Sequence, residues 1–158
     1  MAHIHELNDF ISTVFIVFQD KVLLRLHEKY NIWTGAGGHI ELDEDPNQAA
    51  IREVKEEVGL DIELVSDNFY TFPAYDHKYF DLVPPFAMNI HQIKDGPHHH
   101  IDLIFAAITH SDKIVLESPT DVVKWLSKGE IGSADYLDLR RKQYALQALE
   151  IVSNSNLK

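Results

Sequence analysis

The chain has 158 residues, 45% of which are hydrophobic, and this length and composition predict a single domain spanning residues 1–158. Its formal net charge of −11 at pH 7 argues against binding to long nucleic acid, because proteins that do so normally present a basic surface. The chain has no cysteine, no apolar run near the ~20 residues of a membrane span and no signal-peptide pattern, so we expect a cytoplasmic protein without a disulfide scaffold, a membrane anchor or a cysteine nucleophile.

The N-terminal part of the chain predicts β-structure. Thr13 to Phe18 is apolar and β-branched, and Lys21 to Leu26 follows after two polar residues, a pattern typical of a hairpin. Ile32 to Ile40 contains a glycine-rich turn and a further strand. His3 and His5 precede these strands, and we assign them no role.

A helix is predicted from Pro46 to Val58. Asp45 is a favourable N-cap, proline suits the first helical position, and Gln48 stands where the partner in a capping box belongs. Gly59 supplies the left-handed residue that ends the helix. One apolar face of this helix is expected to be buried, and it comprises Ala50, Ile51, Val54 and Val58.

The same helix carries three clustered carboxylates. Glu53 and Glu57 are four residues apart and share a face, with Glu56 adjacent. One interpretation is a solvated acidic surface that Arg52 and Lys55 partly neutralise. The other is a metal site, because grouped oxygen ligands suit Mg²⁺ or Mn²⁺, which leave coordination positions for phosphate oxygens. We favour the metal site, since the cluster follows directly on a glycine-rich turn.

The run GHIELDEDPNQAAIREVKEEVGL extends from Gly38 to Leu60 and has the spacing G-x5-E-x7-R-E-U-x-E-E-x-G-U, where U is aliphatic. It resembles the Nudix box and lacks none of the fixed positions. The resemblance implies the α/β Nudix fold, in which a mixed β-sheet is sandwiched between α-helices and the box forms a loop-helix-loop. It also implies an enzyme that hydrolyses a phosphoanhydride bond.

By the same resemblance, Glu53, Glu56 and Glu57 match the metal-binding carboxylates of the family, and the Gly38 carbonyl often joins them. The expected cofactor is Mg²⁺, with Mn²⁺ as a substitute. Arg52 matches the arginine that orients the glutamates, as a planar fork of donors can do. These four side chains are the predicted catalytic residues.

Other box positions carry weaker expectations. Glu44 matches an earlier box glutamate whose role varies between members, and Glu53 is our hypothesis for the general base. Gly37 lets the backbone approach metal and phosphate closely. Ala36 stands where many relatives carry proline, a departure also found in some oxidised-purine triphosphate pyrophosphatases.

The second half of the chain completes a mixed α/β pattern. Ile62 to Val65 and Phe69 to Phe72 are strand-like, and Tyr75 to Pro97 is interpreted as a long lid or substrate loop. Ile101 to Thr109 is nearly all apolar, which indicates a strand buried on both faces. A short strand at Ile114 to Leu116 and an amphipathic helix over about 135–152 follow. The aromatic loop and this helix offer surfaces for a homodimer.

Three residues outside the box are candidates for substrate binding. His98, His99 and His100 are consecutive, and neighbours on an extended chain point to opposite faces, so three in a row rarely bind one ion. We therefore interpret the run as a loop entering the next strand, from which His100 at most faces the active site. Tyr75 could stack on a base or belong to the loop's own small core. Glu117 is either an auxiliary ligand or a solvated loop carboxylate.

Together these features predict a metal-dependent pyrophosphohydrolase for a nucleoside diphosphate linked to another group. The first candidate substrates are nucleoside triphosphates, including oxidised purine forms, and nucleotide sugars. Dinucleoside polyphosphates and ADP-ribose are the next candidates. The expected partner is a small nucleotide, because metal ions can stand between an acidic enzyme and a polyanion. The alternative of a different class is a non-catalytic Nudix-like module that senses a nucleotide. Such modules commonly lose box glutamates, and this chain keeps them all.

Overall fold

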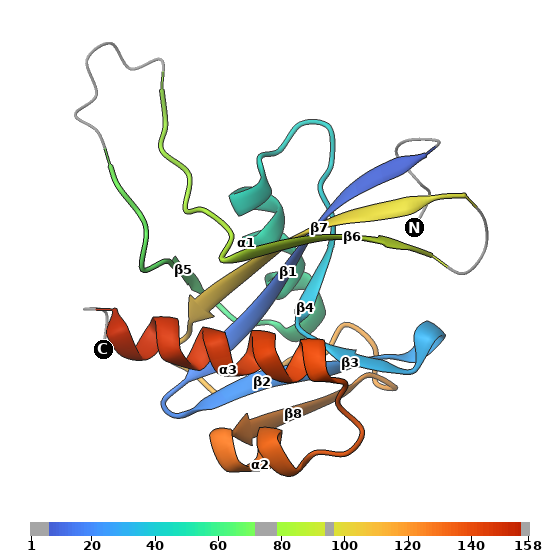
Figure 1. The fold of residues 1–158 in the computed structure, drawn as a ribbon, viewed down its shortest axis with the longest axis vertical. Coiled ribbons are helices and arrows are strands. Elements are labelled where there is room, and N and C mark those ends of the chain that lie inside the picture. The colour runs from blue at the N-terminus through green and yellow to red at the C-terminus, as the bar shows by residue number, and fades with distance from the viewer. Residues whose placement is uncertain (1–6, 72–78, 94–96, 156–158) are drawn as a thin grey trace.

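The structure is a computed structural model that describes residues 7–71, 79–93 and 97–155. Its described residues form a mixed β-sheet with helices on both faces, as Figure 1 shows. The strands are β1 (Asn8–Phe18), β2 (Lys21–His27), β3 (Ile32–Thr34), β4 (Ala36–His39), β5 (Glu63–Val65), β6 (Ala87–Gln92), β7 (His99–Ile108) and β8 (Val122–Ser127). The helices are α1 (Pro46–Val58), α2 (Lys128–Ser133) and α3 (Leu139–Asn154), with a short 3-10 turn at Glu28–Tyr30.

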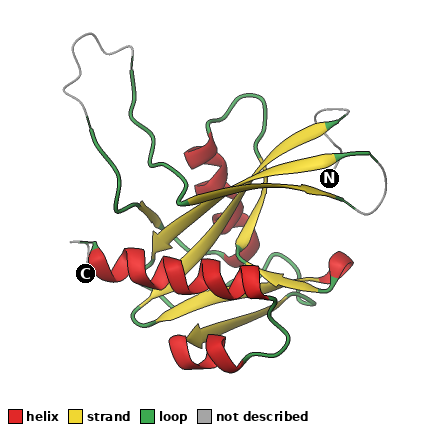
Figure 2. Cartoon of the chain, viewed as in Figure 1, coloured by secondary structure: helices red, strands yellow, loops and turns green. Residues whose placement is uncertain are grey.

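The long strands β1 and β7 run parallel to each other in the middle of the sheet. On β1, Val14 and Ile16 pack with the apolar face of α1, whereas Phe15 and Val17 pack with α3. Figure 2 shows the two helices on opposite sides of the sheet. The expectation that Ile101 to Thr109 is buried on both faces is confirmed for residues 104–109, which are buried from end to end, whereas Ile101 and Leu103 are half-buried.

Strand β1 has two different antiparallel neighbours along one edge. Its C-terminal end pairs with β2 in the predicted hairpin, which turns at Gln19 with a φ of 56°. Its N-terminal half pairs with the glycine-bearing strand β4, with Thr13 opposite Gly37 and Ile11 opposite His39. The box helix follows β4 directly in the chain, so this pairing places the helix N-terminus over β1. Ser12 ties the two together by donating its hydroxyl to the Pro46 carbonyl, 3.0 Å away.

The helix α1 has the bounds and caps that the sequence predicts. The Asp45 carboxylate accepts hydrogen bonds from the backbone N–H groups of Asn47 and Gln48, and the Gln48 side chain accepts one from the Asp45 N–H at 2.9 Å. Gly59 ends the helix with a φ of 72°. Ala50, Val54 and Val58 are buried as expected, but the assignment of Ile51 to the buried face is wrong.

Ile51 is 45% exposed, and Ala49 is buried in its place. Each helical residue is rotated by about 100° from the last, so the stripe defined by Ala50 and Val54 can extend to either flank. The sheet lies on the Ala49 flank. Ile51 instead borders a surface hollow between α1 and β5.

The second half of the chain departs from the sequence analysis in three places. The predicted loop from Tyr75 to Pro97 contains β6, which pairs antiparallel with β7. No strand forms at residues 69–71 or at Ile114 to Leu116, although the Val115 N–H donates to the Val58 carbonyl at 3.0 Å. The strand β8 and the helix α2 are further elements that the sequence pattern does not predict.

The C-terminal helix begins later than predicted. Residues 135–137 form a turn, Asp138 caps the helix by accepting from the Arg141 N–H at 2.9 Å, and the helix continues to Asn154. The predicted buried face is present, with Ala145, Ala148 and Val152 in the core. Within the described part of the chain, no helix combines the length and apolarity that crossing a membrane requires.

The capping box gives a first prediction. Replacing Asp45 by alanine removes the acceptor for two N–H groups at the start of α1 and should lower the free energy of unfolding by about 1 kcal/mol. Urea denaturation followed by circular dichroism measures this. Asp43→Ala, an exposed aspartate in the same loop, is the matched control and should stay within about 0.5 kcal/mol of the parent protein. An equal effect of both substitutions would contradict the capping role.

Candidate active site

The box glutamates lie against the bare backbone of β4. A Cβ atom at Gly38 would collide with the carboxylate of Glu53, so only glycine lets this side chain lie flat on the strand. Gly37 has a φ of 153°, and a Cβ there would collide with the Ser12 carbonyl of β1. The two glycines therefore create space for a carboxylate on one side and for the neighbouring strand on the other.

Arg52 gathers the box carboxylates from within α1. Its Nε and Nη2 atoms donate to the two oxygens of Glu44, at 2.9 and 2.6 Å. Its Nη1 atom donates to Glu53 Oε1 at 2.9 Å and to Glu56 Oε2 at 3.1 Å, and Nη2 also donates to the His39 carbonyl at 3.0 Å. This arginine holds the pKa of Glu44 below its usual range. One side chain thus joins the box loop, the box helix and the end of β4.

Glu57 is held by a second arginine that the sequence analysis missed. The Gly37 N–H donates to Glu57 Oε2 at 2.9 Å, and Arg25 Nη1 of β2 lies 3.0 Å from Glu57 Oε1. Arg25 Nη2 also pairs with Asp121 Oδ2 at 3.3 Å. A signal was present in the sequence, because Arg25 is the one charge in the apolar run Val22 to Leu26. A charge in such a strand needs a partner.

Burial raises the free-energy cost of keeping the clustered carboxylates charged. Glu53 and Glu57 are only 3% and 8% exposed, whereas Glu56 is exposed. Burial raises the pKa of Glu57 to about 7 despite the opposing effect of Arg25, and burial likewise raises that of Glu53 against the effect of Arg52. Carboxylates packed this closely in a poorly solvated place favour a bound cation. The oxygen donor set fits a hard divalent ion such as Mg²⁺.

The other predicted substrate residues are placed differently. Glu117 is exposed beside the end of α1, where its N–H donates to the Glu57 carbonyl at 3.2 Å. His100 lies on the α3 face of the sheet, away from the box carboxylates, next to His98 and Asp9. Tyr75 lies outside the described residues.

A polar cavity of about 120 Å³ lies on the α3 face of the sheet. Asn89 and Asp102 line it from the paired strands β6 and β7, and Arg140, Arg141 and Tyr144 line it from α3. Burial raises the pKa of Asp102 to about 6, and its Oδ1 atom is buried without a hydrogen-bond partner among the described residues. Such an acceptor is suited to recognising a ligand. A larger hollow of about 790 Å³ beside α1 and β5 contains none of the box carboxylates.

Comparison with known proteins identifies this arrangement. The NUDIX domain family matches residues 10–147 of the chain. The chain belongs to the Nudix hydrolase family. Nudix hydrolases act on small nucleotide substrates and are generally dependent on divalent metal ions.

Solved structures agree with the assignment. A NUDIX family hydrolase from Clostridium perfringens is 33% identical, with 91% of this chain and 97% of that chain covered and a TM-score of 0.77. The Escherichia coli dihydroneopterin triphosphate pyrophosphohydrolase is 20% identical, with 94% and 99% covered and a TM-score of 0.63. An ADP-ribose pyrophosphatase from Streptococcus suis is 19% identical, with 94% and 93% covered and a TM-score of 0.55. The last two show that this Nudix hydrolase shares their fold.

The contact between Arg25 and Glu57 gives a second prediction. Arg25→Met leaves the Glu57 carboxylate buried beside other carboxylates and should lower the free energy of unfolding by about 2 kcal/mol, measured by urea denaturation. Lys21→Met, at the exposed start of the same strand, is the control and should change it little.

A double-mutant cycle separates this contact from a general effect of losing Arg25. If the two side chains stabilise each other, Glu57→Gln should cost at least ~1 kcal/mol less in the Arg25→Met background than in the parent protein. If the changes in unfolding free energy of the two single variants simply add up in the double variant, the stabilising contact between Arg25 and Glu57 is contradicted.

Proposed function

We propose that this Nudix hydrolase is a Mg²⁺-dependent pyrophosphohydrolase that cleaves a phosphoanhydride bond in a nucleoside diphosphate linked to another group. The observation that carries the proposal is the set of glutamates that Arg52 and Arg25 hold against the backbone of Gly37 and Gly38. This arrangement concentrates oxygen ligands beside two glycines, Gly37 and Gly38, which have no side chains to obstruct a phosphate. It is costly to build without a cation, which argues for a functional reason.

The proposed metal ligands are Glu53, Glu56 and Glu57, with the carbonyl oxygen of Gly38. A Mg²⁺ ion held there, or Mn²⁺ in its place, would lower the pKa of a bound water and neutralise charge on the phosphate oxygens. Arg52 positions Glu53 and Glu56 through one nitrogen atom, so the spacing between their carboxylates depends on it.

The reaction requires little covalent chemistry from the protein. A water oxygen bonds to phosphorus while the anhydride P–O bond breaks, and the departing phosphate carries the bonding electrons. We assign the water's proton to the Glu53 carboxylate, which is the most buried of the three and adjoins Gly38. The protein's main contribution is the positioning of these charges.

For the part of the substrate beyond the phosphates, we propose the cavity between β6, β7 and α3. The unpartnered oxygen of Asp102 offers an acceptor for the edge of a base, and Arg140 and Arg141 add donors and positive charge. The cavity is connected to the glycine strand, because Thr13, opposite Gly37 in the sheet, hydrogen-bonds Asp102.

Nucleoside triphosphates, including oxidised purine forms, and nucleotide sugars are the substrates that we propose first. Dinucleoside polyphosphates and ADP-ribose are the secondary candidates. The solved relatives include a pyrophosphohydrolase for a triphosphate and a pyrophosphatase for ADP-ribose, so both kinds of substrate belong in any test. The sensing module is disfavoured because no glutamate of the box is missing.

Glu56→Gln is the sharpest test of the hydrolase proposal. Glu56 is exposed and pairs with Arg52, so the neutral variant should keep its fold while phosphate release falls at least ~100-fold, because the cation loses a charged ligand. The assay measures metal-dependent phosphate release with coupled phosphatase, in Mg²⁺ and in Mn²⁺. Its substrates are canonical and oxidised triphosphates, nucleotide sugars, ADP-ribose and diadenosine polyphosphates.

The control is Glu150→Gln, an exposed glutamate on α3, which should retain parental activity. Near-normal turnover by Glu56→Gln would refute the proposed metal ligation. Nucleotide binding without hydrolysis of any substrate would favour the sensing module instead.

A further inference from the structure

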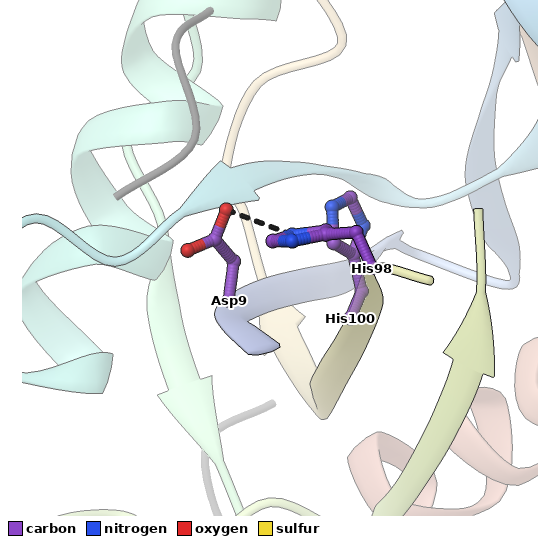
Figure 3. Close-up of side chains that lie close together, drawn as sticks. All are labelled: Asp9, His98 and His100. Carbon is purple, nitrogen blue, oxygen red and sulfur yellow. Dashed lines mark ion pairs between the residues drawn. The ribbon is translucent and has the colours of Figure 1, made fainter. Parts of the chain in front are cut away.

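A second group of metal-binding side chains lies on the opposite face of the sheet from the box. Along β4, Gly38 faces the Glu53 carboxylate, so the next residue, His39, faces the other way. Asp9 of β1, His98 just before β7 and His100 at the start of β7 face the same side as His39. Figure 3 shows the Asp9 carboxylate directed at the His98 ring, with His100 close by.

The ligand atoms of this group converge. One ligand atom from each of Asp9, His98 and His100 lies within 4.8 Å of the other two. Asp9 Oδ2 lies 3.1 Å from His98 Nε2 and 3.3 Å from His39 Nε2. The His100 ring is centred 5.0 Å from that of His39 and 5.6 Å from that of His98.

Two of these separations are those that a tetrahedral metal ion requires. Zn²⁺ binds imidazole nitrogen and carboxylate oxygen at about 2.0–2.2 Å, which places neighbouring ligand atoms roughly 3.3–3.5 Å apart. The distances from the Asp9 oxygen to His98 and to His39 lie near this range. The ligand atom of His100 lies within 4.8 Å of those of Asp9 and His98, and metal binding would draw it closer.

The ligand types indicate the class of metal ion. Asp9 is fully buried and His98 is 7% exposed, so the group is largely shielded from water. Imidazole suits Zn²⁺, Co²⁺ and similar ions, whereas Mg²⁺ prefers oxygen ligands.

We propose that Asp9, His98 and His100, with His39 as the fourth ligand, form a binding site for a divalent transition-metal ion of the Zn²⁺ class. The site differs in ligand chemistry from the box carboxylates and does not depend on the proposed hydrolysis. Its ligands come from the ends of three neighbouring strands, β1, β4 and β7. A bound ion would therefore fix the strand that carries Gly37 and Gly38.

Co²⁺ absorption tests the proposal directly. Metal-free protein in excess Mg²⁺, which occupies oxygen sites, is titrated with Co²⁺ in the visible range. Co²⁺ with four nitrogen and oxygen ligands absorbs far more strongly than the six-coordinate ion in water. We expect an intense band that saturates at one equivalent and disappears on addition of Zn²⁺. We also expect Zn²⁺ to raise the Tm.

Matched variants locate the ion. Asp9→Asn and His100→Gln should each weaken Co²⁺ binding at least ~100-fold, since removing a ligand costs no less than disturbing its supporting contacts. His99→Gln, from the same run but on the opposite face, and Glu56→Gln, from the box, should keep the band. Circular dichroism checks the fold of each variant. If Asp9→Asn does not fold, the result for His100→Gln decides, because His100 is partly exposed and its replacement disturbs the core less.

Absence of an intense band in the parent protein would overturn the proposal, whatever the variants do. A band that survives in His100→Gln would equally overturn it, as would one lost in Glu56→Gln. A one-equivalent band that is lost in His100→Gln and kept in His99→Gln and Glu56→Gln would establish the site.

Discussion

The proposed active site depends on holding three mutually repelling carboxylates together at the edge of a hydrophobic core. Arg52, within the box helix, and Arg25, from β2, supply the opposing charge, and the Gly37 N–H supplies a further donor. Neither arginine alone reaches all three glutamates. The architecture of the first half of the chain follows from this requirement, because β2, β4 and α1 must meet at one place for both arginines to act.

Strand β1 is the common support for that meeting point. It pairs with β2 at one end and with β4 at the other, and its two faces serve different purposes. Towards α1 it contributes Val14 and Ile16 to the core that holds the box helix. On the other face, Asp9 and Thr13 lie beside the imidazole cluster and the polar cavity. One strand thus connects the box carboxylates, the imidazole cluster and the polar cavity.

Local sequence signals predicted the box helix well. The capping residues around Asp45 and the glycine at its end act over a few residues, so their pattern survives without tertiary information. Continuous apolarity likewise identified β7. By contrast, Ile51 was misassigned because periodicity defines a stripe and not its width, and β6 was missed because its alternating exposed residues lie in a stretch rich in polar residues and prolines.

The remaining features depend on non-local pairing, which no local pattern shows. The partnership of Arg25 with Glu57 requires β2 to lie beside the box, and only the sheet order provides that. Along an extended chain, alternation separates the three adjacent histidines and so argues against a shared ion. The same alternation places His98 and His100 on one face, and the parallel pairing of β1 with β7 then brings Asp9 to them.

The central claim is that the arginine-held carboxylates bind the catalytic cation, and anomalous diffraction from crystals soaked in Mn²⁺ tests it most directly. The account predicts an anomalous peak about 2.1–2.2 Å from carboxylate oxygens of the box glutamates and near the Gly38 carbonyl, a peak that is lost in Glu56→Gln crystals. The absence of an anomalous peak beside these glutamates, in crystals soaked at a Mn²⁺ concentration that supports hydrolysis in solution, would contradict the account.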